Sequence, residues 1–200
     1  MTKSQTAVEK GRKRVRFSGP ERRAMILEAA TALISARGYN ALTLARLAEE
    51  CEMTNAGMLH YFASKQDLLV AVLDHQDESN ERFLAEIGVD GSTREGARAF
   101  MDRLIDRDAG CPEIVRLYTI LGAESLDPSH PAHQHLVDRA RRIRERAVAM
   151  TANWHPDPER FVTMVDSFHE GIQLAWLRDP SIDLRAAWRD FADLVFGARP

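Results

Sequence analysis

The fold is decided by the stretch TLARLAEECEMTNAGMLHYFASK, residues 43–65. Thr43 is a good N-cap and apolar residues follow it at helical spacing, so the first half predicts a short helix with one buried face. Those apolar residues are Leu44, Leu47, Ala48 and Cys51. Thr54 predicts a second helix, in which Met58 and Phe62 face the core. Two short helices joined by about three residues are typical of a helix-turn-helix, although the spacing also occurs in helical proteins that bind no DNA.

The second of these helices carries small and polar groups on its outer side, where they can approach a DNA groove. These residues are Asn55, Ala56, Gly57, His60 and Tyr61. We therefore expect this helix to be the one that reads DNA.

The segment before this stretch is strongly basic. Residues 1–23 carry eight Lys and Arg against two Glu, a net charge of +6, whereas the whole chain is −3, so residues 24–200 sum to −9. A basic arm beside a helix-turn-helix, on an acidic remainder, is typical of local phosphate binding. Taken alone, the arm could equally be a solubilising tail or an expression remnant. We expect residues 1–19 to form a flexible arm that contacts DNA through Arg14 and Arg16.

Length and composition predict an ordinary soluble protein. With 200 residues and 44% hydrophobic content, the chain can bury a core for one large or two small domains. No apolar run approaches the roughly 20 residues of a membrane span, and no apolar segment follows the charged N-terminus, so we expect a cytoplasmic protein. Cys51 lies on a buried helix face, so Cys51 and Cys111 are expected to be reduced thiols rather than a disulfide.

Helical patterns fill the rest of the chain, without a credible strand. A first helix is expected from about residue 20 to residue 36, with Gly38 as its stop. Ser64 caps a helix over about 66–87 that should link two domains. Further amphipathic segments are expected at about 93–107, 112–126, 131–153, 158–178 and 183–197, between breaker runs.

The sequence therefore predicts an all-α fold of about nine helices. An arm over residues 1–19 precedes a three-helix, helix-turn-helix DNA-binding domain over residues 20–66. Residues 67–200 are expected to form a helical domain for ligand binding and dimerisation.

Several short motifs occur together between residues 21 and 74. They are Arg22-Arg23 ahead of an Ile-Leu-x-Ala-Ala helix, Gly38-Tyr39, the Thr43 cap, Leu59-His-Tyr-Phe62, Ser64-Lys65 and Leu68-Leu69. Together they resemble the DNA-binding domain of the tetracycline-repressor (TetR) family. More loosely, residues 123–133 and 171–180 resemble the branch that includes the choline-pathway repressor of bacteria.

The resemblance implies roles for individual positions. Family positions that usually contact phosphates are matched by Thr43, Tyr61 and Lys65. Positions of the reading helix that face the major groove are matched by Thr54, Asn55, Gly57 and His60. The chemistry agrees, because an ammonium at a helix N-terminus suits a phosphate and an Asn amide can contact adenine twice. His60 and Tyr61 could instead pack within the protein.

Two positions depart from the family pattern. Glu52 stands where most members have Gly in the turn, so this residue must adopt a positive φ or the turn must bend differently. Leu59 stands where most members have an aromatic residue, and it offers apolar contact to a thymine methyl without a hydrogen bond.

A second copy of the chain is expected, because one short helix reads only a few base pairs. A palindromic operator would present the second site about 34–36 Å away. The resemblance implies that the helices at 131–153 and 158–178 pair in a four-helix bundle. Their apolar stripe consists of Phe161, Val165, Phe168, Ile172, Ala175 and Trp176. An intramolecular core is the alternative for the same stripe.

The resemblance also implies a small-molecule effector among the C-terminal helices, which would release the protein from its operator by population shift. The candidate lining residues are Phe100, Met101, Leu104, Leu117, Tyr118, Leu121, Met150 and Trp154, with Glu124 and His133 as polar contacts. Plain core packing is the alternative for each of them. A DNA-binding protein of architectural type, without an effector, is the competing function.

Metal and catalytic chemistry have weak support. His130, His133 and His135 are close in sequence and could join His155 or His169 at zinc, but no Cys accompanies them and the helix start separates their faces. Phosphate loops, nucleophile elbows and paired-carboxylate signatures are missing from the sequence. We therefore expect no catalytic residue, no metal and no cofactor, and a helical interaction module or metal-dependent enzyme is the remaining alternative.

Overall fold

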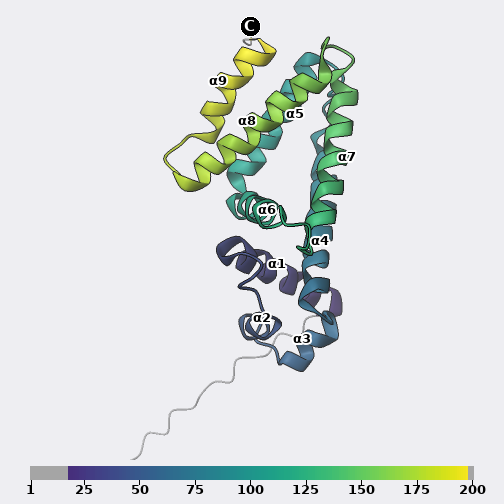
Figure 1. The fold of residues 1–200 in the computed structure, drawn as a ribbon, viewed down its shortest axis with the longest axis vertical. Coiled ribbons are helices and arrows are strands. Elements are labelled where there is room, and N and C mark those ends of the chain that lie inside the picture. The colour runs from purple at the N-terminus through teal and green to yellow at the C-terminus, as the bar shows by residue number, and fades with distance from the viewer. Residues whose placement is uncertain (1–17, 198–200) are drawn as a thin grey trace, which may run out of the picture.

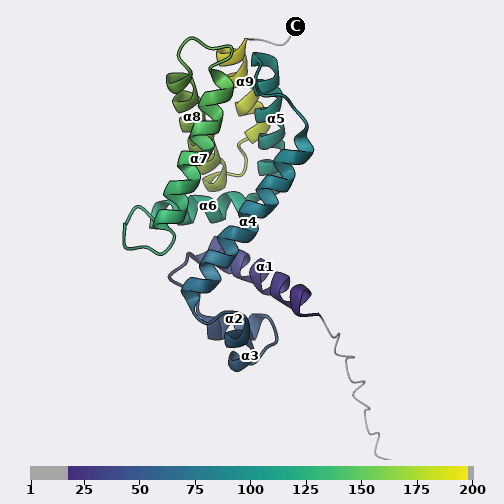
Figure 2. The same cartoon turned by 90° about the vertical axis from the view of Figure 1, so that its right-hand side faces the viewer.

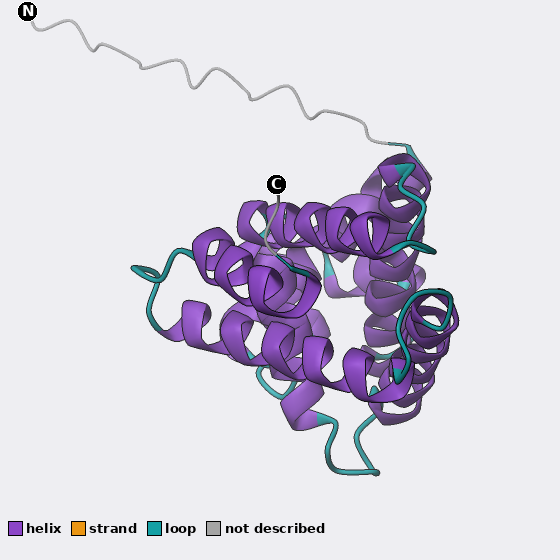
Figure 3. Cartoon of the chain, turned by 90° about the horizontal axis from the view of Figure 1, so that it is seen from above, coloured by secondary structure: helices purple, strands orange, loops and turns teal. Residues whose placement is uncertain are grey.

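The computed structural model describes residues 18–197, and every regular element in that range is a helix (Figure 3). The helices are α1 (Gly19–Arg37), α2 (Leu44–Glu50), α3 (Asn55–Tyr61), α4 (Lys65–Ile87), α5 (Arg94–Gly110), α6 (Pro112–Glu124), α7 (His133–Thr151), α8 (Pro158–Arg178) and α9 (Leu184–Phe196). The all-α prediction is confirmed. Within the described residues, no helix is both long and apolar enough to span a bilayer.

Helices α2, α3 and α4 start at the side-chain caps that the sequence predicts. The Thr43 and Thr54 hydroxyls accept backbone hydrogen bonds from Arg46 (3.2 Å) and Gly57 (3.0 Å). The Ser64 hydroxyl accepts one from the Asp67 backbone N–H (3.0 Å). Each cap satisfies a backbone donor that the first helical turn leaves without a partner.

The helices form two groups along the long axis of the molecule (Figures 1 and 2). At one end, α1, α2 and α3 pack together, and α4 leads away from them. At the other end lie α5, α7, α8 and α9. Between the groups, α6 lies across α1, which makes it the main bridge between the two halves.

Two apolar clusters form the interior. The first cluster contains the buried apolar residues between positions 26 and 73 together with Leu117, Leu121 and Ala132. The second cluster contains Ile105, Phe161, Val165, Leu184, Trp188, Ala192 and Phe196. The core of the helix-turn-helix domain is thus completed by residues from α6 and from the start of α7.

Two turns have the backbone conformations that the sequence analysis anticipates. Gly38 ends α1 with φ 78°, which favours glycine. Glu52 adopts φ 51°, one of the two alternatives for a non-Gly residue in that turn. Glu52 is the one positive-φ residue other than Gly in the described range.

Candidate DNA-binding interface

The exposed face of α3 consists of small and polar residues. Asn55, Ala56 and His60 are exposed, while Gly57 and Tyr61 are half-buried. The half-buried Tyr61 packs partly against the first cluster, and its ring meets that of His60 edge to face, with centroids 5.7 Å apart.

The opposite face of α3 anchors the helix in the protein. Met58 is completely buried and Phe62 is 3% exposed, as the sequence pattern predicts. Leu59 is 45% exposed, so its side chain is available on the surface. Met58 and Phe62 therefore anchor α3 in the core, while its polar face remains accessible.

Lys65 begins α4, and its ammonium lies beside the loop between α1 and α2. Its Nζ is 4.0 Å from the centroid of the Tyr39 ring and donates a hydrogen bond to the Asn40 carbonyl (3.3 Å). Burial lowers the pKa of Lys65, and the negative charge of Glu124 opposes that shift. A Lys ammonium has three donors, so Lys65 keeps donors for a phosphate beside its contact with Asn40.

The other predicted phosphate contacts differ in accessibility. Thr43 is exposed although its hydroxyl also caps α2. Arg14 and Arg16 lie outside the described residues. The sequence analysis assigned no role to Tyr39 or Asn40, and the Gly38-Tyr39 motif was the one signal that pointed to them.

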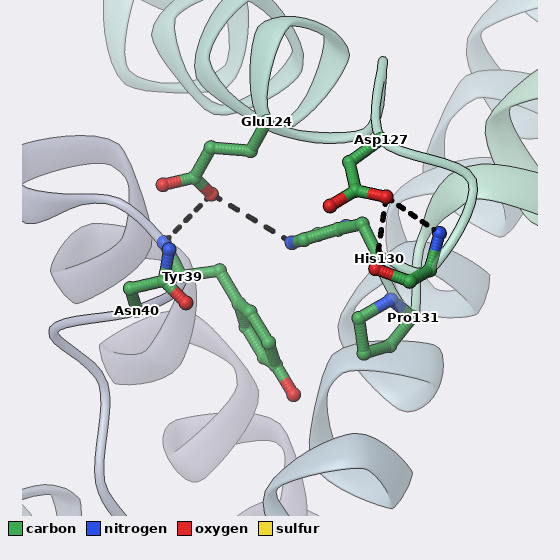
Figure 4. A pocket seen from close by; sticks show the side chains of 7 residues that line it. Tyr39, Asn40, Glu124, Asp127, His130 and Pro131 are labelled. Atoms are coloured by element: carbon green, nitrogen blue, oxygen red, sulfur yellow. Dashed lines mark hydrogen bonds and ion pairs between the residues drawn. The ribbon is translucent and has the colours of Figure 1, made fainter.

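A cavity of about 310 Å³ lies where the helix-turn-helix domain meets the rest of the chain (Figure 4). The α1–α2 loop contributes Tyr39 and Asn40 to its lining. The end of α6 and the turn after it contribute Glu124, Asp127, Ser129, His130 and Pro131. Glu124, a predicted polar contact of the effector, therefore faces the DNA-binding half of the molecule.

The other predicted pocket residues are divided between the two apolar clusters. Leu117 and Leu121 are completely buried in the first cluster, while Met101 and Trp154 pack against the second. His133 is held locally, with its Nδ1 2.7 Å from the Ser125 carbonyl oxygen. The remaining four, Phe100, Leu104, Tyr118 and Met150, are partly buried.

A larger cavity, of about 510 Å³, lies between α4 and α5. It is lined by Phe83, Glu86, Ile87, Arg103, Asp106 and Arg107. None of the ten predicted pocket residues is among them.

The predicted dimer stripe lies largely inside one chain. Phe161 and Val165 are buried in the second cluster, and Phe168 stacks on Phe191 of α9 with ring centroids 3.9 Å apart. Ile172 and Trp176 are partly buried against the same cluster. Large apolar side chains that stay exposed on α7 and α8 are Val137, Ile143, Met164 and Leu174. A partner chain would thus meet these side chains before it reached Phe161 or Val165.

Two of the histidines considered as zinc ligands, His135 and His169, each contact a carboxylate. His135 Nε2 is 3.1 Å from Asp77 Oδ2, and His169 Nε2 is 2.8 Å from Asp108 Oδ2. From residue 18 to residue 197, no three or more His, Cys, Asp or Glu side chains are grouped so that they could hold a metal ion.

Comparison with known proteins agrees with this architecture. Residues 26–72 match the family described as "Bacterial regulatory proteins, tetR family". A search of the curated proteins finds no match.

Solved structures share the fold over most of the chain. A TetR-like transcriptional regulator from Rhodococcus sp. RHA1 is 18% identical, with a TM-score of 0.72 over 90% of this chain and 97% of that one. AibR, solved with isovaleryl coenzyme A and operator DNA, is 21% identical, with a TM-score of 0.70 over 90% and 100%. A protein from Saccharomonospora viridis in complex with choline is 21% identical, with a TM-score of 0.71 over 87% and 96%.

A capped helix-turn-helix with an accessible polar face, mounted on a larger helical domain, defines a DNA-binding regulator. The match at residues 26–72 identifies its kind more closely. Residues 26–72 thus form a DNA-binding domain of the kind described for the tetR family of bacterial regulatory proteins.

Proposed function

We propose that this protein is a homodimeric transcriptional repressor that binds a palindromic operator and leaves it when a small molecule binds. The observation that carries the proposal is the accessible polar face of α3 beside the Lys65 ammonium at the start of α4. The first group can contact base edges and the second can contact a phosphate, which together provide specificity and position.

The division of labour follows the helices. We assign DNA binding to residues 20–66, with the arm at 1–19 as an additional phosphate contact, and regulation and dimerisation to residues 67–200. We assign no enzymatic activity to the chain, and we place it in the cytoplasm, where it would meet chromosomal DNA. Dimerisation through α7 and α8 would space the two copies of α3 for successive major grooves.

The effector site is proposed among the helices of the C-terminal group. Its candidate lining is Phe100, Leu104, Tyr118 and Met150, which are all partly buried; Tyr118 also packs against the first cluster, whereas the other three belong to neither cluster. Two proteins of this fold were solved with isovaleryl coenzyme A and with choline. These two compounds are therefore the first probes to test.

Selection of bound fragments from genomic DNA tests operator binding and supplies a duplex for titration. We expect discrimination among sequences and a steep fall in affinity with added salt, since phosphate contacts release counterions. A wild-type protein that binds no duplex, even at low salt, would contradict the proposal.

Two variants separate the roles within the interface. Lys65→Ala should weaken binding to all duplexes and reduce the salt dependence by about one ion, as expected for one lost phosphate contact. Asn55→Ala should relax preference at one base pair, at a cost of about 1–3 kcal/mol on the best duplex. Equal effects on affinity and preference from both variants would overturn this assignment.

Thermal unfolding with and without each probe compound tests effector control. A compound that binds the folded protein raises the unfolding temperature, and we expect the same compound to lower operator affinity. Specific DNA binding with no response to any compound would favour the architectural alternative.

A further inference from the structure

Glu124, at the end of α6, reaches across the boundary between the two halves of the molecule. Its Oε2 accepts a hydrogen bond from the Tyr39 backbone N–H (3.0 Å), across 85 positions of sequence. A Cβ added to Gly38 would stand 2.5 Å from Glu124 Oε1, so the carboxylate lies close against this glycine. One carboxylate from the C-terminal half therefore holds the loop that leads into α2 (Figure 4).

The same loop holds the Lys65 ammonium. Lys65 Nζ lies over the Tyr39 ring and donates a hydrogen bond to the Asn40 carbonyl. Its two described contacts are therefore Tyr39, which Glu124 also contacts, and the residue that follows Tyr39. A short chain of contacts thus runs from Glu124 through Tyr39 to Lys65. It joins the end of α6 to the start of α4.

His130, in the turn before α7, lies beside the carboxylate and against the Tyr39 ring. The His130 side chain is 9% exposed, and its ring meets the Tyr39 ring edge to face with centroids 5.1 Å apart. The Ala132 backbone N–H donates to His130 Nδ1 (3.2 Å), which places the hydrogen of the neutral ring on Nε2. That Nε2 has no hydrogen-bond partner within residues 18–197 and lies 3.9 Å from Glu124 Oε2.

We propose that Glu124 is a positioning residue for DNA binding, which holds the Tyr39 loop and, through it, the Lys65 ammonium at its phosphate. This inference rests on the proposed function and adds a route for its regulation. Because the carboxylate belongs to α6, a shift of α6 would move or release the Lys65 contact. Such a shift would also disturb the first cluster, because α6 contributes Leu117 and Leu121 to it.

The test measures binding of the full-length protein to a genomically selected duplex over a range of salt concentrations. The proteins compared are wild type, Glu124→Ala, Lys65→Ala and the double variant. Glu124→Ala should reduce affinity by about tenfold, on the scale of one charge-assisted hydrogen bond. It should also reduce the salt dependence nearly as much as Lys65→Ala does, because both changes lose the same phosphate contact.

The double variant provides the decisive comparison. If Glu124 acts through Lys65, then Glu124→Ala should change affinity by less than about twofold once Lys65 is already Ala. Equal losses in the two backgrounds would overturn the inference, as would an unchanged salt dependence in Glu124→Ala.

Two further variants separate positioning from general loss of structure. Glu124→Gln keeps an oxygen that can accept from Tyr39, so it should bind within about threefold of wild type. Glu113→Ala removes an exposed carboxylate from the same helix and should leave affinity unchanged. Loss of binding in either variant as large as in Glu124→Ala would contradict the inference.

Hydrogen exchange in the protein without DNA gives an independent readout. The Tyr39 amide should exchange faster in Glu124→Ala and remain protected in Glu124→Gln. A wild-type protein that binds no duplex would overturn the proposed function itself. Normal wild-type binding with additive losses would overturn the role of Glu124 alone.

Discussion

Different kinds of contact stabilise the N-terminal half and the C-terminal half of this protein. From α1 to α4, each helix starts at a Ser or Thr cap and turns apolar residues into one cluster. In the C-terminal half, α5, α8 and α9 have side-chain caps whereas α6 and α7 do not, and polar side chains join helices far apart in sequence beside the second cluster. Asp77 contacts Arg139, for example, and His169 contacts Asp108.

We therefore expect the helix-turn-helix domain, called the reading domain below, to keep its shape when the C-terminal helices shift. Helix caps depend on neighbours in the chain, so they tolerate movement elsewhere. Polar contacts between helices have defined geometry and can exchange partners when a helix shifts. The exception is α6, because its apolar face belongs to the reading domain and its last residue touches the Tyr39 loop.

The largest expected effect tests whether α6 belongs to the core of the reading domain. Leu117 is completely buried there, so Leu117→Ala should lower the free energy of unfolding by about 3 kcal/mol, within a range of about 2–5 kcal/mol. Leu126→Ala, at a position in the turn after α6 that is 81% exposed, should cost less than about 0.5 kcal/mol. Urea unfolding measures both. Similar small losses would mean that the reading domain does not depend on α6.

The next effect tests the polar contacts of the C-terminal half. Asp77 accepts from Arg139 Nε (3.0 Å) and from the Tyr118 hydroxyl (3.3 Å), and its side chain is 25% exposed. Asp77→Asn should therefore cost about 2 kcal/mol, because the half-buried carboxylate loses the charge that strengthens its hydrogen bonds and its ion pair with Arg139. Asp74→Asn removes an exposed carboxylate from the same helix and should be nearly neutral in urea unfolding. Equal stabilities of the two variants would refute a structural role for the network.

An effect of similar size separates two glycines near α6. Gly38 has φ 78° and ψ 165°, a region that is almost restricted to glycine, so Gly38→Ala should cost about 2 kcal/mol. Gly122 lies inside α6 with open space around it, so Gly122→Ala should stabilise the protein by about 0.5–1 kcal/mol. Thermal unfolding should show shifts of opposite sign. Shifts of the same sign would argue against the described conformation of the Gly38 turn.

The smallest effect tests the local caps. Thr54→Ala removes the acceptor for the Gly57 backbone N–H, and it should cost about 1 kcal/mol in thermal unfolding. Thr54→Ser retains a hydroxyl and should recover most of that loss. A Ser variant no more stable than the Ala variant would show that the hydroxyl is not what stabilises the start of α3.

Sequence reasoning succeeded where neighbours in the chain decide the structure. The caps at Thr43, Thr54 and Ser64, the stop at Gly38 and the burial of Met58 all follow from patterns a few residues long. The helix order and the family resemblance follow from the same patterns.

The place of Glu124 could not be read from the sequence. Its partner lies 85 residues away, and an acidic residue at the end of an amphipathic helix suits an effector pocket as well as a domain boundary. The stripe from Phe161 to Trp176 had a similar ambiguity, because apolar residues at helical spacing suit a core or an interface equally. The packing of α9 places Phe161 and Val165 in an apolar cluster within one chain, and the sequence pattern does not reveal this packing.

The sequence by itself therefore determined the all-α class, the helix-turn-helix and the polar face of α3, because helix periods and caps are local properties of the chain. The tertiary structure alone decided that α6 completes the reading domain and that Glu124 meets the Tyr39 loop. The physical reason is that such contacts depend on how whole helices pack, and many packings satisfy the same short-range pattern.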